Sequence, residues 1–103
     1  MMKYVFVIQW PGSSMEDYDE MVAIENLLIS SVSKNSRVDG HDVGSDEVNI
    51  FIETNDPQRL YDEVRSLLGS HEAWSNIRLA YRSMEGDAYT VLWPKNLRDF
   101  DVR

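Results

Sequence analysis

The sequence predicts an α+β domain in which two helices pack on one antiparallel sheet. Three observations support this fold class: an apolar, strand-like run at residues 3–10, two segments with helical spacing of apolar residues, and shorter runs that alternate between apolar and polar residues. The chain has 103 residues, of which 43% are hydrophobic and 27% are charged. We therefore expect one globular domain over residues 1–103, with 94–103 as a short C-terminal tail.

The first predicted strand is Lys3 to Trp10, "KYVFVIQW", which ends before Pro11 and Gly12. A strand that is apolar on both alternating faces is typical of the middle of a sheet that is covered on both sides. The first predicted helix follows over residues 13–32, and Ser13 and Glu16 have the spacing of a capping box at its start. Its apolar residues recur at helical spacing: Met15, Tyr18, Met21, Val22, Leu28, Ile29 and Val32, with Ile24 and Leu27 beside them.

A hairpin comes next in the sequence. Residues 37–43 predict a polar edge strand, residues 44–46 a turn, and residues 47–54, "EVNIFIET", a strand with clear alternation. In that strand Val48, Ile50 and Ile52 point to one face.

The second predicted helix begins at Asp56-Pro57, because aspartate caps a helix and proline suits its first position. Leu60, Val64 and Leu67-Leu68 supply its apolar stripe, and Gly69 is expected to end it in the left-handed conformation. Two further strands are expected over residues 76–84 and 88–93, joined by a turn at residues 85–87.

The element order is therefore β-α-β-β-α-β with an added C-terminal hairpin strand. The first six elements match the pattern of ferredoxin-like two-layer sandwiches, in which the first and third strands are central. We expect the additional strand to extend one edge of the sheet.

This architecture leaves one sheet face to be covered by something other than helices. We expect the face of the first strand that carries Tyr4, Phe6 and Ile8 to be an interface, because a large uncovered apolar patch is unusual on a monomer. The candidate covers are a partner subunit, a ligand, or the C-terminal segment with Trp93 and Phe100. The interface candidates are Tyr4, Phe6, Ile8, Trp10, Phe51 and Trp93, of which the two tryptophans can also close the edges of the core.

The densest polar constellation is "DGHDVGSDE" at residues 39–47, where His41, Asp39 and Asp42 are candidates for a ligand or polar site. The calcium-loop pattern fails because oxygen ligands are missing from the required positions, and no metal site is predicted. His41 has the intrinsic pKa range of a general acid or base. The alternative is structural: Gly40 allows a bulge in an edge strand, and aspartates cap the turn.

Several function classes have little support. There is no cysteine, no serine in a nucleophile motif and no phosphate-binding loop, and no cofactor is predicted. Eighteen acidic residues against ten basic ones give a net charge of −8, which opposes binding to nucleic acid or anionic membrane and favours a basic protein partner. No apolar run reaches the length of a membrane span, and we expect a cytoplasmic protein.

The stretches "VDGHDVGSDEVNIFIETNDP" and "AYTVLWP" resemble those of small, functionally uncharacterised bacterial proteins of ferredoxin-like α+β type. The resemblance implies a cytoplasmic α+β protein and no catalytic motif. Immunity proteins, which neutralise toxins, are similar in size and acidity.

The function that these observations favour is a non-enzymatic protein-binding module. It would act by self-association as a homodimer or through an acidic surface for a basic partner, such as a cognate toxin. The alternative is a dimer that binds a small molecule, or acts as an enzyme, in a pocket on the open sheet face near His41.

Overall fold

The computed structural model describes residues 2–12, 15–44 and 46–102, with all of their side chains except those of Met15 and Ala73. Its strands are β1 (Tyr4–Pro11), β2 (Ser36–Gly44), β3 (Glu47–Thr54), β4 (Arg78–Ser83) and β5 (Thr90–Trp93). Its helices are α1 (Met15–Ser31), α2 (Pro57–Leu68) and the short 3₁₀ helix η1 (Glu72–Asn76). The predicted capping box at Ser13 lies outside the described residues.

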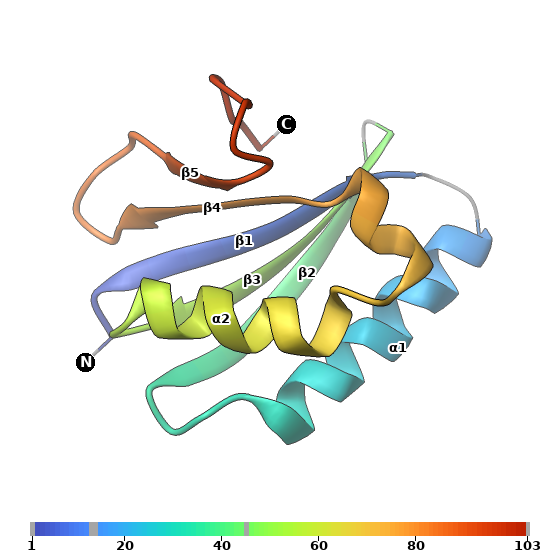
Figure 1. The fold of residues 1–103 in the computed structure, drawn as a ribbon, viewed down its shortest axis with the longest axis horizontal. Coiled ribbons are helices and arrows are strands. Elements are labelled where there is room, and N and C mark those ends of the chain that lie inside the picture. The colour runs from blue at the N-terminus through green and yellow to red at the C-terminus, as the bar shows by residue number, and fades with distance from the viewer. Residues whose placement is uncertain (1, 13–14, 45, 103) are drawn as a thin grey trace.

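The five strands form one antiparallel sheet in the order β2-β3-β1-β4-β5, with α1 and α2 on the same side of it (Figure 1). The α+β class and the central positions of β1 and β3 are confirmed, as is the place of β5 at the edge beside β4. Neither α1 nor α2, within the part of the chain that the structure describes, has the length and apolarity needed to cross a membrane.

The helices cover the sheet face that carries the larger side chains of β1. Phe6 and Ile8 are completely buried and Trp10 is 3% exposed, and they belong to one core with residues of α1 and α2. We call this the helix face. The expectation that Phe6 and Ile8 belong to an open interface face is therefore wrong, and Trp10 is also buried, whereas Tyr4 at the end of the strand is half-buried. Burying the bulkiest apolar side chains between the two layers removes the most apolar area from water, so the helices pack on this face.

Helix α1 buries a narrower stripe than its sequence predicts. Met21, Ile24 and Leu28 are buried, whereas Tyr18 and Ile29 are exposed, Ile29 by 59%. Three buried residues in three successive turns suffice to contact the sheet, and the remaining apolar residues of α1 lie at the margin of the contact or on its outer side.

Helix α2 begins as predicted and ends differently. The Asp56 side chain accepts a hydrogen bond from the Arg59 backbone N–H (3.0 Å), and Pro57 occupies the first turn. Gly69 has right-handed helical torsion angles (φ −60°) and not the left-handed conformation that we expected. A Cβ atom at Gly69 would lie 2.6 Å from the Arg65 carbonyl oxygen, so glycine is required there by space.

Strand β2 contains the predicted bulge. Its register with β3 shifts between Val38 and Gly40, so that Asp39 has no direct partner across the ladder. After the bulge His41 lies opposite Ile50, on the helix face.

The other sheet face is covered in part by the C-terminal segment. Val7 and Ala80 lie on this face and are fully buried, although no helix packs there. Residues 94–102, which we call the strap, follow β5 without regular secondary structure and turn back over the sheet (Figure 1). We call this second face the strap face.

Candidate functional site

Polar side chains form a row across the strap face. The register of the sheet places four residues side by side on neighbouring strands: Asp42 on β2, Asn49 on β3, Gln9 on β1 and Arg78 on β4. The next row along the strands is apolar and contains Phe51, Val7 and Ala80. A polar row in the central strands of a sheet is costly unless each group is hydrogen-bonded.

The centre of this row is buried and hydrogen-bonded. Gln9 is 1% exposed, Asn49 is fully buried, and Glu47, one row further toward the end of β3, is 6% exposed. The Gln9 amide Nε2 donates to Glu47 Oε2 (3.0 Å) and to Asn49 Oδ1 (2.9 Å). Asn49 Nδ2 also donates to Glu47 Oε2 (3.2 Å). Two amide groups therefore solvate one buried carboxylate.

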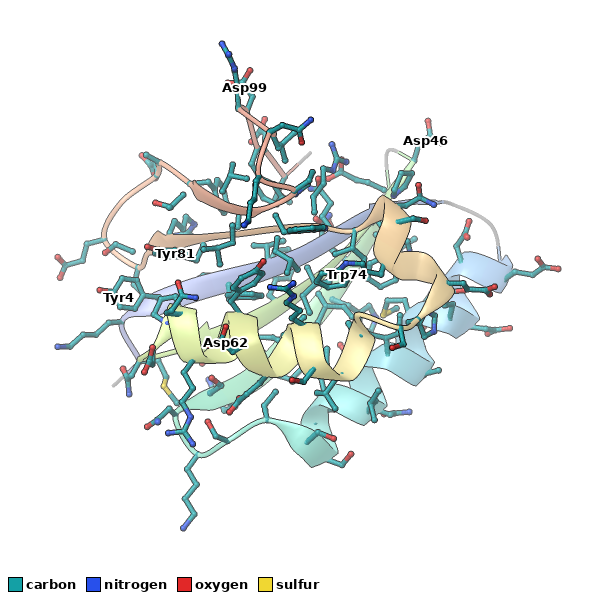
Figure 2. The ribbon with its side chains drawn as sticks, viewed as in Figure 1. Tyr4, Asp46, Asp62, Trp74, Tyr81 and Asp99 are labelled. Atoms are coloured by element: carbon teal, nitrogen blue, oxygen red, sulfur yellow. The ribbon has the colours of Figure 1, made fainter. Side chains whose placement is uncertain are left out.

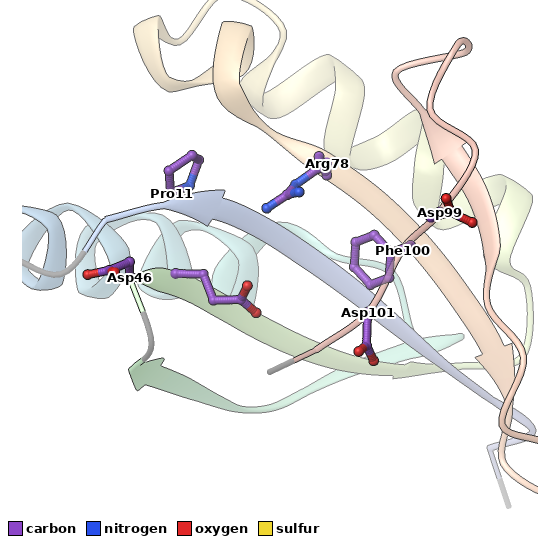
Figure 3. A pocket seen from close by; sticks show the side chains of 7 residues that line it. Pro11, Asp46, Arg78, Asp99, Phe100 and Asp101 are labelled. Carbon is purple, nitrogen blue, oxygen red and sulfur yellow. The ribbon is translucent and has the colours of Figure 1, made fainter.

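The strap closes over this network. A third acceptor, the backbone carbonyl oxygen of Asp101, lies 2.9 Å from Gln9 Nε2 and competes for its two hydrogens. The preceding residue, Phe100, is half-buried, and its ring contacts that of Tyr89 with the centroids 4.9 Å apart. Figure 3 shows Phe100 and Asp101 on the strap where it crosses the sheet. An aromatic contact and a backbone acceptor are thus among the contacts that hold the strap.

A hollow of about 330 Å³ lies between the strap and the end of the sheet (Figure 3). Four carboxylates line it together with one guanidinium, and its lining residues are Pro11, Asp46, Glu47, Arg78, Asp99, Phe100 and Asp101. Arg78 takes part in no ion pair with the residues that the structure describes. Among its described lining residues carboxylates dominate, and Arg78 is the one cation.

A second hollow of about 290 Å³ shares Pro11 with the first. Three carboxylates line it, and its lining residues are Trp10, Pro11, Asp17, Glu20, Glu72 and Asn76. The indole N–H of Trp10 is buried and has no acceptor among the described residues. The two hollows lie where β1 ends, and we call their seven carboxylates the acidic end: Asp17, Glu20, Asp46, Glu47, Glu72, Asp99 and Asp101.

His41 lies away from both hollows. Its Nδ1 is 3.0 Å from the Glu25 carboxylate of α1, and its ring meets that of Tyr18 edge-on with the centroids 6.0 Å apart. Its side chain is 33% exposed. These contacts join the edge strand β2 to α1. They indicate that His41 helps to fix the helix on the sheet.

The three candidates of the 39–42 segment do not converge. The bulge interrupts the strand alternation, so that Asp39 lies 3.9 Å from Arg37 Nη2 while His41 turns under α1. Asp42 lies in the polar row, next to Asn49. Regular strand alternation would have placed Asp39 and His41 on the same face and Asp42 on the other, and the bulge overturns that expectation for Asp39 and His41. Among residues 2–12, 15–44 and 46–102, no three His, Asp or Glu side chains are placed to hold a metal ion together.

The remaining interface candidates lie on both faces. Trp93, opposite Leu79 in the sheet, stacks on Trp74 of η1 with the ring centroids 5.5 Å apart. Tyr4 contacts Tyr81 edge-on at the end of the sheet opposite Asp46 (Figure 2). Phe51 is half-buried on the strap face, and it is the aromatic candidate that this face still presents to solvent.

Gln9, Glu47, Asn49 and Arg78 were not singled out as site residues by the sequence. The signal for two of them is present: Gln9 and Asn49 are the polar residues in the central, otherwise apolar runs of β1 and β3. Their juxtaposition depends on the register of the two strands, which no local pattern gives.

Comparison of the chain with protein-family models, with curated proteins and with solved structures found no match. The structure supports the α+β class that the resemblance implied. The resemblance to small bacterial proteins itself stays a prediction. Any functional conclusion has to come from the geometry of the chain.

Proposed function

We propose that this protein is a non-enzymatic binding module whose acidic end docks a basic protein partner. The observation that carries the proposal is the pair of adjoining hollows at the end of β1, whose described lining residues include seven carboxylates and one cation, Arg78. The net charge of −8 adds a long-range attraction for a basic surface.

The shape of the acidic end suits side chains of lysine and arginine. Both hollows are concave and offer apolar surface beside the carboxylates, from Phe100 and Pro11 in one and from Trp10 and Pro11 in the other. The alkyl stem of a lysine or arginine can pack on such surface while its charged group reaches a carboxylate. A cognate toxin with a basic binding surface is one partner of this kind.

We also infer that the first six elements form a ferredoxin-like sandwich. Strand β3 lies between β1 and β2, and β1 lies between β3 and β4. Each β-α-β unit is therefore split by one inserted antiparallel strand, which is the arrangement that defines the split β-α-β pattern. Strand β5 then adds to the β4 edge. An experimental structure with a different strand order would overturn this inference.

The test of function compares two variants with equal changes of charge. The acidic-end variant carries Asp46→Asn, Asp99→Asn and Asp101→Asn, and the control carries Asp62→Asn, Glu85→Gln and Asp87→Asn at exposed positions elsewhere. Immobilised wild type and control should retain the same basic protein from cells that produce this chain, and rising salt should release it. The acidic-end variant should lose it, and titration of the purified partner should show at least a tenfold higher Kd. Equal retention by both variants would refute the proposal.

Self-association is a second candidate, favoured by the part of the strap face that the strap leaves open. Phe51 and Val5 are half-buried there, and a hollow of about 410 Å³ adjoins them, lined by Met2, Arg37, Glu53 and Met84. A dimer through this surface should resist salt and dissociate with Phe51→Asp, because apolar contacts are not screened. Native mass spectrometry that finds only monomer at micromolar concentration would exclude it.

A small-molecule site at His41 has less support. Five hollows over the described residues have no His41 in their lining. The Nδ1 of His41 bonds to Glu25 and its ring contacts that of Tyr18, so the imidazole has a structural role in the fold.

A further inference from the structure

The Gln9 amide has more acceptors than it can serve. Its Nε2 atom carries two hydrogens and lies within 3.0 Å of three oxygens: Glu47 Oε2, Asn49 Oδ1 and the Asp101 carbonyl. The Asp101 carbonyl is the one acceptor of the three that belongs to the strap. If the strap leaves, both hydrogens of Gln9 still have acceptors on β3.

Opening the strap therefore leaves no buried donor without a partner in the sheet. The largest cost of breaking a buried hydrogen bond is usually the unsatisfied group that remains, and here that cost is absent on the sheet side. The strap also contacts the domain through the ring pair of Phe100 and Tyr89. Segments with few contacts and no regular secondary structure are those that open at low free energy.

The strap is also a poor electrostatic fit to its own site. The strap carboxylates Asp99 and Asp101 line the same hollow as Asp46 and Glu47. Like charges brought together in a partly enclosed space repel one another. An occupant with the same backbone and the opposite charge at the position of Asp101 would be attracted instead.

We propose that the strap is a displaceable occupant of a peptide-binding platform formed by Gln9, Asn49, Glu47 and Asp46. The ligand is an extended segment of the partner, with an aromatic residue in the place of Phe100 followed directly by lysine or arginine in the place of Asp101. Its backbone carbonyl accepts from Gln9, as that of Asp101 does. This inference rests on the proposed function, because it names the part of the basic partner that enters the acidic end.

The test uses two blocked peptides with the sequence of residues 97–102, one unchanged and one with lysine in place of Asp101. Titration of the full chain is followed through the side-chain amide signals of Gln9 in ¹H–¹⁵N spectra. The lysine peptide should shift these signals and bind roughly three- to tenfold more tightly than the unchanged peptide, which is the factor expected for one partly exposed charge pair. Its advantage should shrink in high salt.

Two variants of the chain separate displacement from binding elsewhere. Phe100→Ala weakens the resident strap and should raise the affinity for the lysine peptide. Asp101→Lys, at an exposed position, should strengthen the strap and lower that affinity by a similar factor. Peptide affinities that are equal for wild type, Phe100→Ala and Asp101→Lys would overturn the proposal, as would Gln9 signals that do not move.

The peptide titration and the charge-variant experiment can fail independently, so failure of the strap exchange can be told from failure of the proposed docking function. If the acidic-end variant loses the basic partner while the lysine peptide leaves Gln9 unchanged, the docking surface stands and the strap exchange is wrong. If the peptide displaces the strap while the matched charge variants retain the partner equally, the acidic end is not the docking surface, and strap exchange as an account of partner binding is wrong with it.

Discussion

The two faces of the sheet are covered in different ways. The helix face is closed by two helices that contribute large apolar side chains, and Phe6, Ile8 and Leu79 are completely buried there. The strap face is closed by an irregular segment, and a hydrogen-bonded polar network lies beneath it. The helices are stabilised on their face by the burial of apolar surface, and they are part of the core. The strap has no regular secondary structure, and under our proposal it can leave without unfolding the domain.

The largest expected difference concerns two phenylalanines on opposite faces. Phe6→Ala should lower the free energy of unfolding by about 3–5 kcal/mol, because it removes a fully buried ring from the core. Phe51→Ala should lower it by about 1 kcal/mol, because its ring is half-buried and water already reaches it. Urea denaturation measures both. Equal losses would mean that the strap face is as much a core as the helix face.

The second comparison concerns a buried polar group on each face. Thr54, on the helix face, bonds to Ser36 Oγ (2.8 Å), the Asn35 carbonyl (3.2 Å) and the Asp56 N–H (3.0 Å). Thr54→Val and Gln9→Met should each lower the free energy of unfolding by about 1–3 kcal/mol, because buried groups lose their partners.

The two substitutions should differ in where hydrogen exchange accelerates. Gln9→Met removes the donor that holds the Asp101 carbonyl, so the backbone of residues 98–102 should exchange faster while the helices do not change. Thr54→Val should leave the strap unaffected. Faster exchange of the strap in both variants would show that the two faces are coupled.

A smaller effect is expected at His41. His41→Ala removes the contact with Glu25, which is partly exposed, and should lower the free energy of unfolding by less than about 1 kcal/mol. Binding of the basic partner should stay unchanged because His41 lies away from the acidic end. A loss of binding with unchanged stability would return His41 to the list of functional residues.

The smallest expected effect has the opposite sign. The Tyr61 hydroxyl is buried without a hydrogen-bond partner among the described residues. Tyr61→Phe removes this group and should leave the stability unchanged or raise it by up to about 1 kcal/mol, as measured by thermal denaturation. A clear loss of stability would indicate that the hydroxyl has a bound water as its partner.

The elements and the order of the strands could be predicted because each signal is local. The alternation in "EVNIFIET", the Asp56-Pro57 start of α2 and the apolar character of β1 all appear in short windows. The side of β1 that the helices would cover could not be predicted in this way. Both faces of that strand are apolar, so the choice depends on the total area that the two helices bury.

The site was harder to predict because it depends on register and on an irregular segment. Gln9 meets Asn49 only through the pairing of β1 with β3, and Asp39 separates from His41 only through a bulge. Gly69 was misread because glycine also fits where space is short, without a left-handed conformation. The path of the strap has no periodic pattern from which it could be inferred.

The stack of Trp93 on Trp74 fixes the point at which the strap begins. When the strap opens, it stays covalently attached to the domain at Trp93. Such a short tether keeps the effective concentration of the strap at its own site on the order of millimolar. A free peptide in the cell cannot compete at that level unless it binds very tightly. A segment delivered by a protein already docked at the acidic end has a comparable local concentration. The covalent attachment of the strap would therefore allow segments of docked partners to bind the platform while it excludes free peptides.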